Sequence, residues 1–441
     1  MSVGPFPSVP SRSGRRADIV HHTIATNSAS AISASRKIHA IVGRGGVSRC
    51  VAWSWRWVAV AALLALHGCV TPPPAPPAAP AVYRPAAWRD LPGFERDRVA
   101  EVLPAFLAGC GAIARKPGQA PAWQAACDAA RQLPAADDAA TRAWLQAHFT
   151  PYRVAFPDGR DRGLVTGYYE PVIAGSRTRT ATHRVPILAP PDDLLVVELG
   201  ALHPELVDRR VRGRLEGRRV VPYWSRAEIE AGKAPAAGKA LAFVADPLDA
   251  FFLQVQGSGR ITLADGAVLR VGYADQNGHP YTPVARVLIE RGEMTREEAS
   301  MQAIRAWAQA HPDRVAALLD ANASYVFFRE LPPAAPGTPA AAIDGPEGAL
   351  GVPLLAQRTI AVDPRAIPLG APVWLATTEP PSAQPLERLV VAQDTGGAIR
   401  GAVRADFFWG HGDLAADRAG RMKEEGRLWL IWPRGAKLPG S

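Results

Sequence analysis

Two aspartates, Asp394 and Asp406, stand twelve residues apart in a stretch that could carry out acid–base chemistry. An apolar run, Leu389 to Ala392, leads into Asp394, and Gly396-Gly397 follows where the backbone can turn sharply. Asp406 is followed at once by Phe407-Phe408-Trp409. Aromatic bulk beside a carboxyl group is one way to keep it protonated near neutral pH. The stretch therefore predicts either a pair of carboxyls for proton transfer or a hairpin with two solvated aspartates.

A second stretch, from Gly163 to Pro171, alternates glycines with aromatic and polar side chains on a short predicted strand. Tyrosine rings beside hydroxyl and carboxylate groups suit a sugar, which has apolar faces and a polar rim. An edge strand with buried tyrosines would give the same pattern. The candidate sugar-binding residues of this stretch are Thr166, Tyr168, Tyr169 and Glu170.

A third stretch adds two amides. We expect a strand from Ala250 to Gln256, which would place Gln254 and Gln256 on one face. That face leads into Gly257-Ser258-Gly259, which is not the GxGxxG pattern of a dinucleotide-binding loop. A solvated strand face is the alternative to a binding surface. The candidates for recognising hydroxyl or acetamido groups are Gln254, Gln256 and Ser258.

Two known chemistries use carboxylates of this kind. Asp394-Thr395-Gly396 after an apolar run matches the aspartic-protease triplet, but that mechanism needs two such aspartates sharing a proton. No second Asp-Thr-Gly or Asp-Ser-Gly occurs in the chain, which disfavours a protease. A two-carboxylate glycosidase is the other chemistry, although the sequence does not give the separation of the carboxyls. Its candidate residues are Glu330, Asp363, Asp394 and Asp406.

The net charge of +9 belongs mainly to the beginning of the chain. Residues 1–68 contain eight Lys or Arg and one acidic residue, so they carry +7 and the remaining chain carries +2. This distribution argues against nucleic acid as a partner. The four cysteines form no CxxC pair and the ten histidines form no HExxH motif. We therefore expect no metal site and no cofactor.

A ten-residue apolar core, Trp57 to Leu66, follows an arginine and has the size of a signal-peptide core. It ends Leu66-His67-Gly68-Cys69, which resembles a bacterial lipobox, in which the cysteine is lipidated and becomes the mature N-terminus. An ordinary signal peptide with an incidental cysteine is the alternative. The proline-rich run after Val70 suits a tether. Because a signal core should lie near the start of translation, residues 1–46 are expected to be a start-site error or disordered.

Helical spacing of apolar residues dominates residues 91–148, and residues 185–290 are rich in predicted strands. Thr295 to Asp320 is predicted to be helical and divided by Pro312. Cys110 and Cys127 could form a disulfide in an exported protein, or remain two reduced core cysteines. Short strands at regular spacing then suggest a closed barrel. They are expected at Ser324–Phe328, Arg358–Val362, Pro372–Ala376, Leu386–Ala392 and Leu428–Trp432.

Three aspartates with their flanking residues resemble the signature of the membrane-bound lytic murein transglycosylase A family. They are Asp363 in the segment from Ala361 to Gly370, Asp394 in the segment from Ala392 to Ile399, and Asp406 in the segment from Arg404 to Gly410. The resemblance covers roughly residues 90–435 with the motifs in order. Its other motifs are Gly167–Pro171, Phe252–Gly259, Val271–Tyr273, Tyr325–Arg329 and Gly351–Pro353.

The resemblance implies a mainly β fold with peripheral helices. It has a double-psi β-barrel domain with a second β-rich domain inserted and a groove between them. On this basis residues 1–68 are the leader and 69–90 the tether. Residues 91–171 and 322–441 would form the barrel domain with its N-terminal helices, and residues 172–321 the inserted substrate-binding domain.

The activity that the resemblance implies is that of a peptidoglycan lytic exotransglycosylase, a carbon–oxygen lyase, although endo or exo action is open. The β-1,4 bond between N-acetylmuramic acid and N-acetylglucosamine would be cleaved without water, leaving a 1,6-anhydro ring. Asp406 aligns with the family's acid, Asp394 would support it, and Asp363 would be structural or would contact substrate.

The implied partners are peptidoglycan glycan strands, the membrane through a lipid on Cys69, and a cell-wall synthesis or division complex as a further candidate. The implied location is the periplasmic face of the outer membrane. A peptidoglycan-binding lipoprotein without turnover is the alternative.

Overall fold

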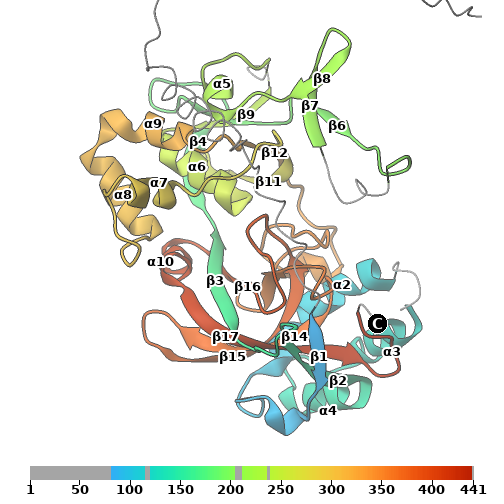
Figure 1. The fold of residues 1–441 in the computed structure, drawn as a ribbon. Coiled ribbons are helices and arrows are strands. Elements are labelled where there is room, and N and C mark those ends of the chain that lie inside the picture. The colour runs from blue at the N-terminus through green and yellow to red at the C-terminus, as the bar shows by residue number, and fades with distance from the viewer. Residues whose placement is uncertain (1–80, 115–119, 204–210, 236–238, 440–441) are drawn as a thin grey trace, which may run out of the picture. The chain divides into compact units, whose positions relative to one another are not determined.

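A computed structural model describes residues 81–114, 120–203, 211–235 and 239–439 of the chain. The predicted signal core, Cys69 and most of the proline-rich tether lie outside these residues. The described residues belong to one compact unit, and most of their strands lie in two large sheets (Figure 1).

Six strands of the first sheet close on themselves, in the order β17-β14-β15-β13-β16-β3 and back to β17. Two of the neighbouring pairs, β13–β15 and β16–β3, are parallel. The predicted closed barrel within a mainly β fold is therefore confirmed. The strands are β3 (Gly163–Glu170), β13 (Thr359–Val362), β14 (Pro372–Glu379), β15 (Gln384–Asp394), β16 (Ala405–His411) and β17 (Lys423–Pro433).

The barrel strands are long apolar runs because their side chains are buried by other elements as well as by the barrel interior. All four residues of β13 are buried, as are Val390 to Gln393 of β15 and Leu428 to Pro433 of β17. The sequence patterns predict five of these six strands and miss β16, which carries Asp406. Helix α10 (Asp413–Arg421) follows β16 and packs on β3 and β16.

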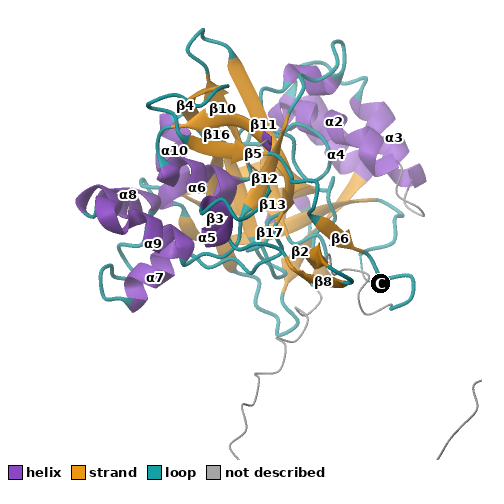
Figure 2. Ribbon diagram, turned by 90° about the horizontal axis from the view of Figure 1, so that it is seen from above, coloured by secondary structure: helices purple, strands orange, loops and turns teal. Residues whose placement is uncertain are grey.

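Helices from the beginning of the described chain cover one part of the barrel, and α2, α3 and α4 lie together in both views (Figure 2). A disulfide between Cys110 and Cys127 joins α2 to α3 and resolves the alternative that the sequence left open. The elements are β1 (Val82–Pro85), α2 (Leu103–Ala114), α3 (Ala120–Ala130), α4 (Asp138–His148), β2 (Phe149–Ala155) and short 3-10 helices at Trp88–Asp90 and Val99–Val102.

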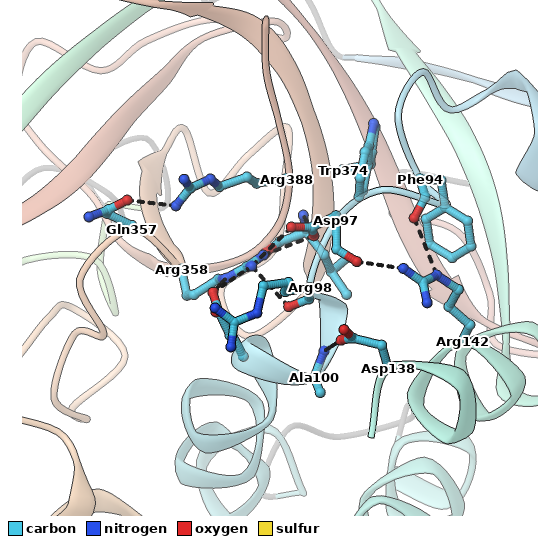
Figure 3. A network of polar contacts seen from close by, with 12 residues as sticks. Phe94, Asp97, Arg98, Ala100, Asp138, Arg142, Gln357, Arg358, Trp374 and Arg388 are labelled. Carbon is cyan, nitrogen blue, oxygen red and sulfur yellow. Dashed lines mark hydrogen bonds and ion pairs between the residues drawn. The ribbon is translucent and has the colours of Figure 1, made fainter. Parts of the chain in front are cut away.

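A buried arginine, Arg358, fixes the N-terminal segment to the barrel (Figure 3). Its guanidinium donates to both carboxylate oxygens of Asp97 at 2.9 Å and to Glu101 at 2.8 Å. Asp97 also accepts from the backbone N–H of Leu389, at the same 2.9 Å. Such a bidentate pair needs the planar fork of arginine, and loss of one partner would leave a buried charge uncompensated.

The second sheet is six-stranded, with the order β12-β11-β10-β4-β9-β5, and β6-β7-β8 form a smaller sheet. Strand β12 pairs here although it lies beyond residue 321, so we place the end of the inserted domain after Glu330. The strands are β4 (Val172–Ser176), β5 (Val185–Leu188), β6 (Leu195–Val197), β7 (Val211–Glu216), β8 (Arg219–Pro222), β9 (Ala240–Val244), β10 (Ser258–Thr262), β11 (Val268–Gln276) and β12 (Val326–Glu330).

Helices α6 to α9 form a separate group beside this second sheet (Figure 2). Pro312 divides α8 from α9 as predicted, but α8 begins six residues later than Thr295, because the side chain of Ser300 accepts from the N–H of Ala303. The helices are α5 (Arg226–Glu230), α6 (Pro247–Gln256), α7 (Val284–Glu290), α8 (Met301–Ala310), α9 (Val315–Asp320) and 3-10 helices at Pro312–Arg314 and Pro339–Ala342.

The strand predicted from Ala250 to Gln256 is wrong, because this segment belongs to helix α6. The side chain of Asp246 caps the helix by accepting from the N–H of Leu248, and Pro247 occupies its first turn. Gly257 ends it with φ of 80°. A short apolar run suits a buried strand and a buried helix equally, and here the caps at both ends decide for the helix.

Candidate active site

The two aspartates of the C-terminal stretch both receive hydrogen bonds from strand β3. Asp406 lies opposite Thr166 in the parallel pair β16–β3, and the Thr166 hydroxyl donates to Oδ1 of Asp406 at 2.6 Å. Two residues along the same face of β3, the Tyr168 hydroxyl donates to Oδ2 of Asp394 at 3.1 Å. The structure thus brings together four of the predicted site residues: Thr166, Tyr168, Asp394 and Asp406.

Asp394 ends strand β15, where the chain leaves the barrel. Besides the bond from Tyr168, its Oδ1 accepts from the backbone N–H of Ala349 at 3.0 Å. Burial raises the pKa of Asp394 to about 6 against the lowering effect of these donors, and the nearby charge of Asp406 raises it further. Each carboxylate oxygen of Asp394 thus accepts a hydrogen bond from a neutral donor, Oδ1 from Ala349 and Oδ2 from Tyr168.

Asp406 is half-buried, and burial raises its pKa above the ordinary range. The Thr166 hydrogen bond and the charge of Arg404 act in the opposite direction. Of the three aromatics that follow, Phe408 shares the face of β16 with Asp406 and contacts Tyr168, with 5.1 Å between ring centroids. Phe407 and Trp409 belong to the large core of the barrel domain, so the aromatic run does not surround the carboxyl as a whole.

Arg404 determines which oxygen of Asp406 can carry a proton. Its Nη2 donates to Oγ1 of Thr166 at 2.8 Å, and guanidinium groups only donate. The single hydroxyl proton of Thr166 therefore points to Oδ1 of Asp406. Among the residues that the structure describes, no hydrogen bond reaches Oδ2 of Asp406, and this oxygen is the one that can hold a proton and present it.

Asp363, the third aspartate, has partners of a different kind. Its carboxylate accepts from Nε and Nη2 of Arg365 and from the backbone N–H of Gly401 at 2.9 Å. Although burial opposes them, these bonds lower the pKa of Asp363 below its ordinary value. Because Gly401 lies between Asp394 and Asp406, Asp363 anchors the connection between the two aspartates.

The remaining predicted residues lie elsewhere. Tyr169 is on the opposite face of β3 from Tyr168 and borders a cavity of about 350 Å³ with Asp249, Arg305 and Asp413. Its backbone N–H donates to the side chain of Gln256 at 3.2 Å.

Gln254 is buried and accepts from Arg226, while Ser258 is buried at the start of β10. Glu170 is fully buried and accepts from Nε of Arg260 at 2.8 Å. We assign Gln254 and Glu170 to internal contacts, since both side chains are buried and neither is accessible to a glycan.

Two groups at the site were missed from the sequence. Arg404 lies two residues before Asp406, a spacing that could have suggested it, although its bond is to Thr166 on another strand. Ala349 contributes a backbone N–H from a loop, for which a sequence gives no signal. Across the described ranges, no three or more His, Cys, Asp or Glu residues gather as a metal site. No helix of those ranges is long and apolar enough to cross a membrane.

Comparisons with known proteins agree with this arrangement. A model of the MltA specific insert domain matches residues 164–329, and a model of the 3D domain matches residues 358–432. Membrane-bound lytic murein transglycosylase A of Escherichia coli strain K12 is 37% identical over 298 residues, which cover 66% of this chain and 71% of the relative.

Two solved structures extend the likeness to the fold. MltA of Neisseria gonorrhoeae is 36% identical and superposes with a TM-score of 0.69, over 82% of this chain and 99% of that chain. MltA of Escherichia coli with bound chitohexaose is 28% identical with a TM-score of 0.56, over 81% of this chain and 94% of that one. The barrel, the second domain and the aspartate cluster thus occur together in a chain that these relatives match over most of their length.

Proposed function

Because the chain belongs to the membrane-bound lytic murein transglycosylase A family, we propose that it cleaves peptidoglycan glycan strands without water. The bond cleaved is the β-1,4 linkage between N-acetylmuramic acid and N-acetylglucosamine, and the product ends in a 1,6-anhydro ring. The observation that carries the proposal is the contrast between two half-buried carboxyls, one with both oxygens hydrogen-bonded and one with an oxygen available.

Asp406 is the general acid and then the general base of this reaction. In its protonated form it donates the proton from Oδ2 to the leaving glycosidic oxygen as the bond to C1 breaks. The resulting carboxylate takes the proton of the C6 hydroxyl, whose oxygen forms the new bond to C1 within the same sugar. A nucleophile inside the substrate has an effective molarity of roughly 10⁵ M or more, so no water and no second carboxylate is required.

The raised pKa of Asp406 serves the first step, because a carboxyl that is ionised at the working pH has no proton to give. The Thr166 hydroxyl holds the carboxyl in place and stabilises the carboxylate that forms after proton transfer. Asp394 has both oxygens engaged, so it acts as a supporting group that orients Tyr168 beside the reacting carboxyl.

The substrate is a polymer of β-1,4-linked amino sugars. The Escherichia coli relative was solved with chitohexaose, a chain of the same linkage, bound to it. In this chain Thr166 and Tyr168 lie nearest to the two aspartates, and we assign them to the sugar that reacts. Tyr169, Gln256 and Ser258, which the cluster does not include, remain candidates for sugars farther along the strand.

We also infer that the protein is anchored at the periplasmic face of the outer membrane through a lipid on Cys69. Membrane attachment is part of the name of the Escherichia coli relative. The lipobox-like segment and the proline-rich run after it support the same inference from the sequence.

Digestion of purified sacculi in H₂¹⁸O, followed by mass spectrometry of the released muropeptides, tests the reaction. We expect anhydro-muropeptides that contain no ¹⁸O, because the new bond to C1 comes from the C6 oxygen. Reducing ends carrying ¹⁸O would identify a two-carboxylate hydrolase instead. Binding to sacculi without release of any muropeptide would identify the binding-only alternative.

A further inference from the structure

A short segment, residues 344–350, links the second sheet to the aspartate cluster, and we call it the strap. At its C-terminal end the N–H of Leu350 donates to the carbonyl of Gln393 at 3.0 Å, and the N–H of Ala349 donates to Asp394 at the same distance. At its N-terminal end Asp344 and Gly345 accept from arginines of β10 and β11. The strap therefore contains, within six residues, both Asp344, which accepts from an arginine of the second sheet, and Ala349, which donates to Asp394.

Arg260, on β10, binds the N-terminal end of the strap together with Arg270 of β11, which donates to the carbonyl of Gly345. Its Nη2 and Nη1 donate to the two carboxylate oxygens of Asp344 at 2.7 and 3.0 Å. Its Nε donates to Glu170 at 2.8 Å, and its backbone N–H donates to the carbonyl of Pro171 at the same distance. One guanidinium thus bridges the end of β3 to the strap.

Both arms of this bridge lead to Asp394. Glu170 is two residues from Tyr168 on the same face of β3, and Tyr168 donates to Oδ2 of Asp394. Asp344 is five residues from Ala349, whose N–H donates to Oδ1 of Asp394. Tyr168 and Ala349, two of the donors to Asp394, come from separate parts of the chain, and Arg260 contacts both parts.

We propose that Arg260 is a positioning residue for the reaction: by binding Glu170 and Asp344 together, it fixes the Tyr168 hydroxyl and the Ala349 N–H against Asp394. The proposal rests on the proposed function only in that the cluster is assigned to that reaction. Arg260 itself contacts neither Asp394 nor Asp406, and it acts through β3 and the strap.

The chemistry of the bridge requires an arginine. The side chain of Arg260 is 12% exposed and that of Glu170 is fully buried, so water competes weakly for the bond between them, whereas the side chain of Asp344 is 64% exposed. Three nitrogens in one plane reach two carboxylates at once, which a lysine ammonium on a flexible stem does not reproduce. Another arginine, Arg329, donates one hydrogen bond to Glu347 of the strap, whereas Arg260 binds both carboxylate oxygens of Asp344.

The test compares Arg260→Gln, Arg260→Lys and Asp344→Asn with the control Arg177→Gln. Arg177, directly after β4, pairs with Glu330 at the end of β12 and reaches neither β3 nor the strap, so its loss imitates the change in charge without releasing the bridge. Thermal unfolding confirms that each variant is folded. Turnover of a soluble glycan strand gives kcat and KM as a function of pH.

We expect kcat to fall about 10- to 100-fold in Arg260→Gln and Asp344→Asn, with KM changing less than about threefold, because reacting groups are misplaced while the sugar contacts remain. Arg260→Lys should recover only part of the loss. The double variant should be no slower than Arg260→Gln, since both substitutions break one bridge. If Arg260→Gln and Asp344→Asn match Arg177→Gln in kcat and in pH profile, the proposal is wrong.

A second measurement does not depend on turnover. The groups facing Asp394 are Tyr168, Asp406 and the backbone N–H groups of Ala349 and Thr395, of which the donors lower its pKa and Asp406 raises it. Loss of the Tyr168 and Ala349 donors in Arg260→Gln should therefore move the pKa of Asp394 above its value of about 6. A ¹³C NMR titration of the carboxyl detects this shift, and an unchanged titration overturns the proposal. If the parent protein releases no glycan fragments but the NMR shift occurs, the proposed function fails and the positioning role stands.

Discussion

The aspartate cluster and the Arg358 network both place carboxylates inside the same domain, yet their partners differ in charge. Asp97 binds a guanidinium with both oxygens, and the result holds the N-terminal segment on the barrel (Figure 3). Asp394 and Asp406 accept from a phenol, a backbone N–H and a hydroxyl.

The difference separates a structural carboxylate from one that can move a proton. A guanidinium carries a full positive charge and therefore favours the ionised form of a carboxyl group more than a neutral donor does. Neutral donors offset burial only in part, so the pKa values of Asp394 and Asp406 rise. Asp363, which lies beside the cluster but binds Arg365, has a lowered pKa and falls with the structural group.

The largest expected effect is on the cluster. Asp406→Asn keeps the shape of the side chain but removes the transferable proton, so the rate of glycan cleavage should fall on the order of 10²- to 10⁴-fold. The melting temperature of Asp406→Asn should stay close to that of the parent protein, because a neutral amide is no harder to bury than a protonated carboxyl. Full activity of Asp406→Asn would contradict the assignment of the acid.

Asp394→Asn is the matched comparison for that variant, since it changes the neighbouring carboxyl in the same way. If Asp394→Asn abolishes cleavage while Asp406→Asn does not, the two roles should be exchanged.

The next effect is on the network. Asp97→Asn should lower the free energy of unfolding by about 3–5 kcal/mol, because it leaves the buried guanidinium of Arg358 without its main counter-charge. Chemical denaturation measures this loss, and cleavage per folded molecule should stay close to that of the parent. The control is Asp158→Asn, which breaks an exposed pair with Arg160. Equal stability of the two variants would show that Arg358 does not depend on Asp97.

The smallest effect is the pH dependence of the free energy of unfolding. It should have opposite signs for Asp394, whose pKa is raised, and Asp363, whose pKa is lowered. The pKa of Asp394 is about 6 when folded and roughly 3.9 when unfolded, so its contribution is full below about pH 4 and is lost as pH rises through 6. Asp394→Asn should remove this loss, which is on the order of 3 kcal/mol for a difference of about 2 pKa units.

The folded-state pKa of Asp363 is lowered, so its contribution is present above roughly pH 3.9 and is lost as pH falls. Asp363→Asn should remove that loss on the acid side. Denaturation curves from pH 3 to 7.5 compare the two variants, and the same sign of change in both would contradict the separation of the aspartates.

The sequence predicted features that depend on local pattern. Apolar alternation located most barrel strands, and motif order pointed to Asp394, Asp406, Thr166 and Tyr168 before any contact was known. It failed where a pattern suits two structures, as in α6, where Asp246 and Gly257 were needed to exclude a strand. The predicted strand also placed Gln254 and Gln256 on one face. Both lie in helix α6, where residues two apart point in different directions.

Contacts between distant segments could not be predicted at all. The N–H of Ala349 and the bridge made by Arg260 depend on how the loop before β13 crosses the chain, and no spacing in the sequence encodes that path. Glu170 follows two tyrosines in the motif, but its carboxylate forms an ion pair with Arg260 of β10. The motif does not predict this ion pair, because the arginine belongs to a distant segment of the chain.

A ¹³C NMR titration of the aspartate carboxyls tests the central claim most directly. The signal that disappears in Asp406→Asn identifies the carboxyl of Asp406. We predict that its pKa lies above the value of roughly 3.9 for an exposed aspartate, while that of Asp363 lies below it. A pKa of Asp406 at or below 3.9 would mean that the group is ionised at working pH, and that it is not the proton donor of the reaction.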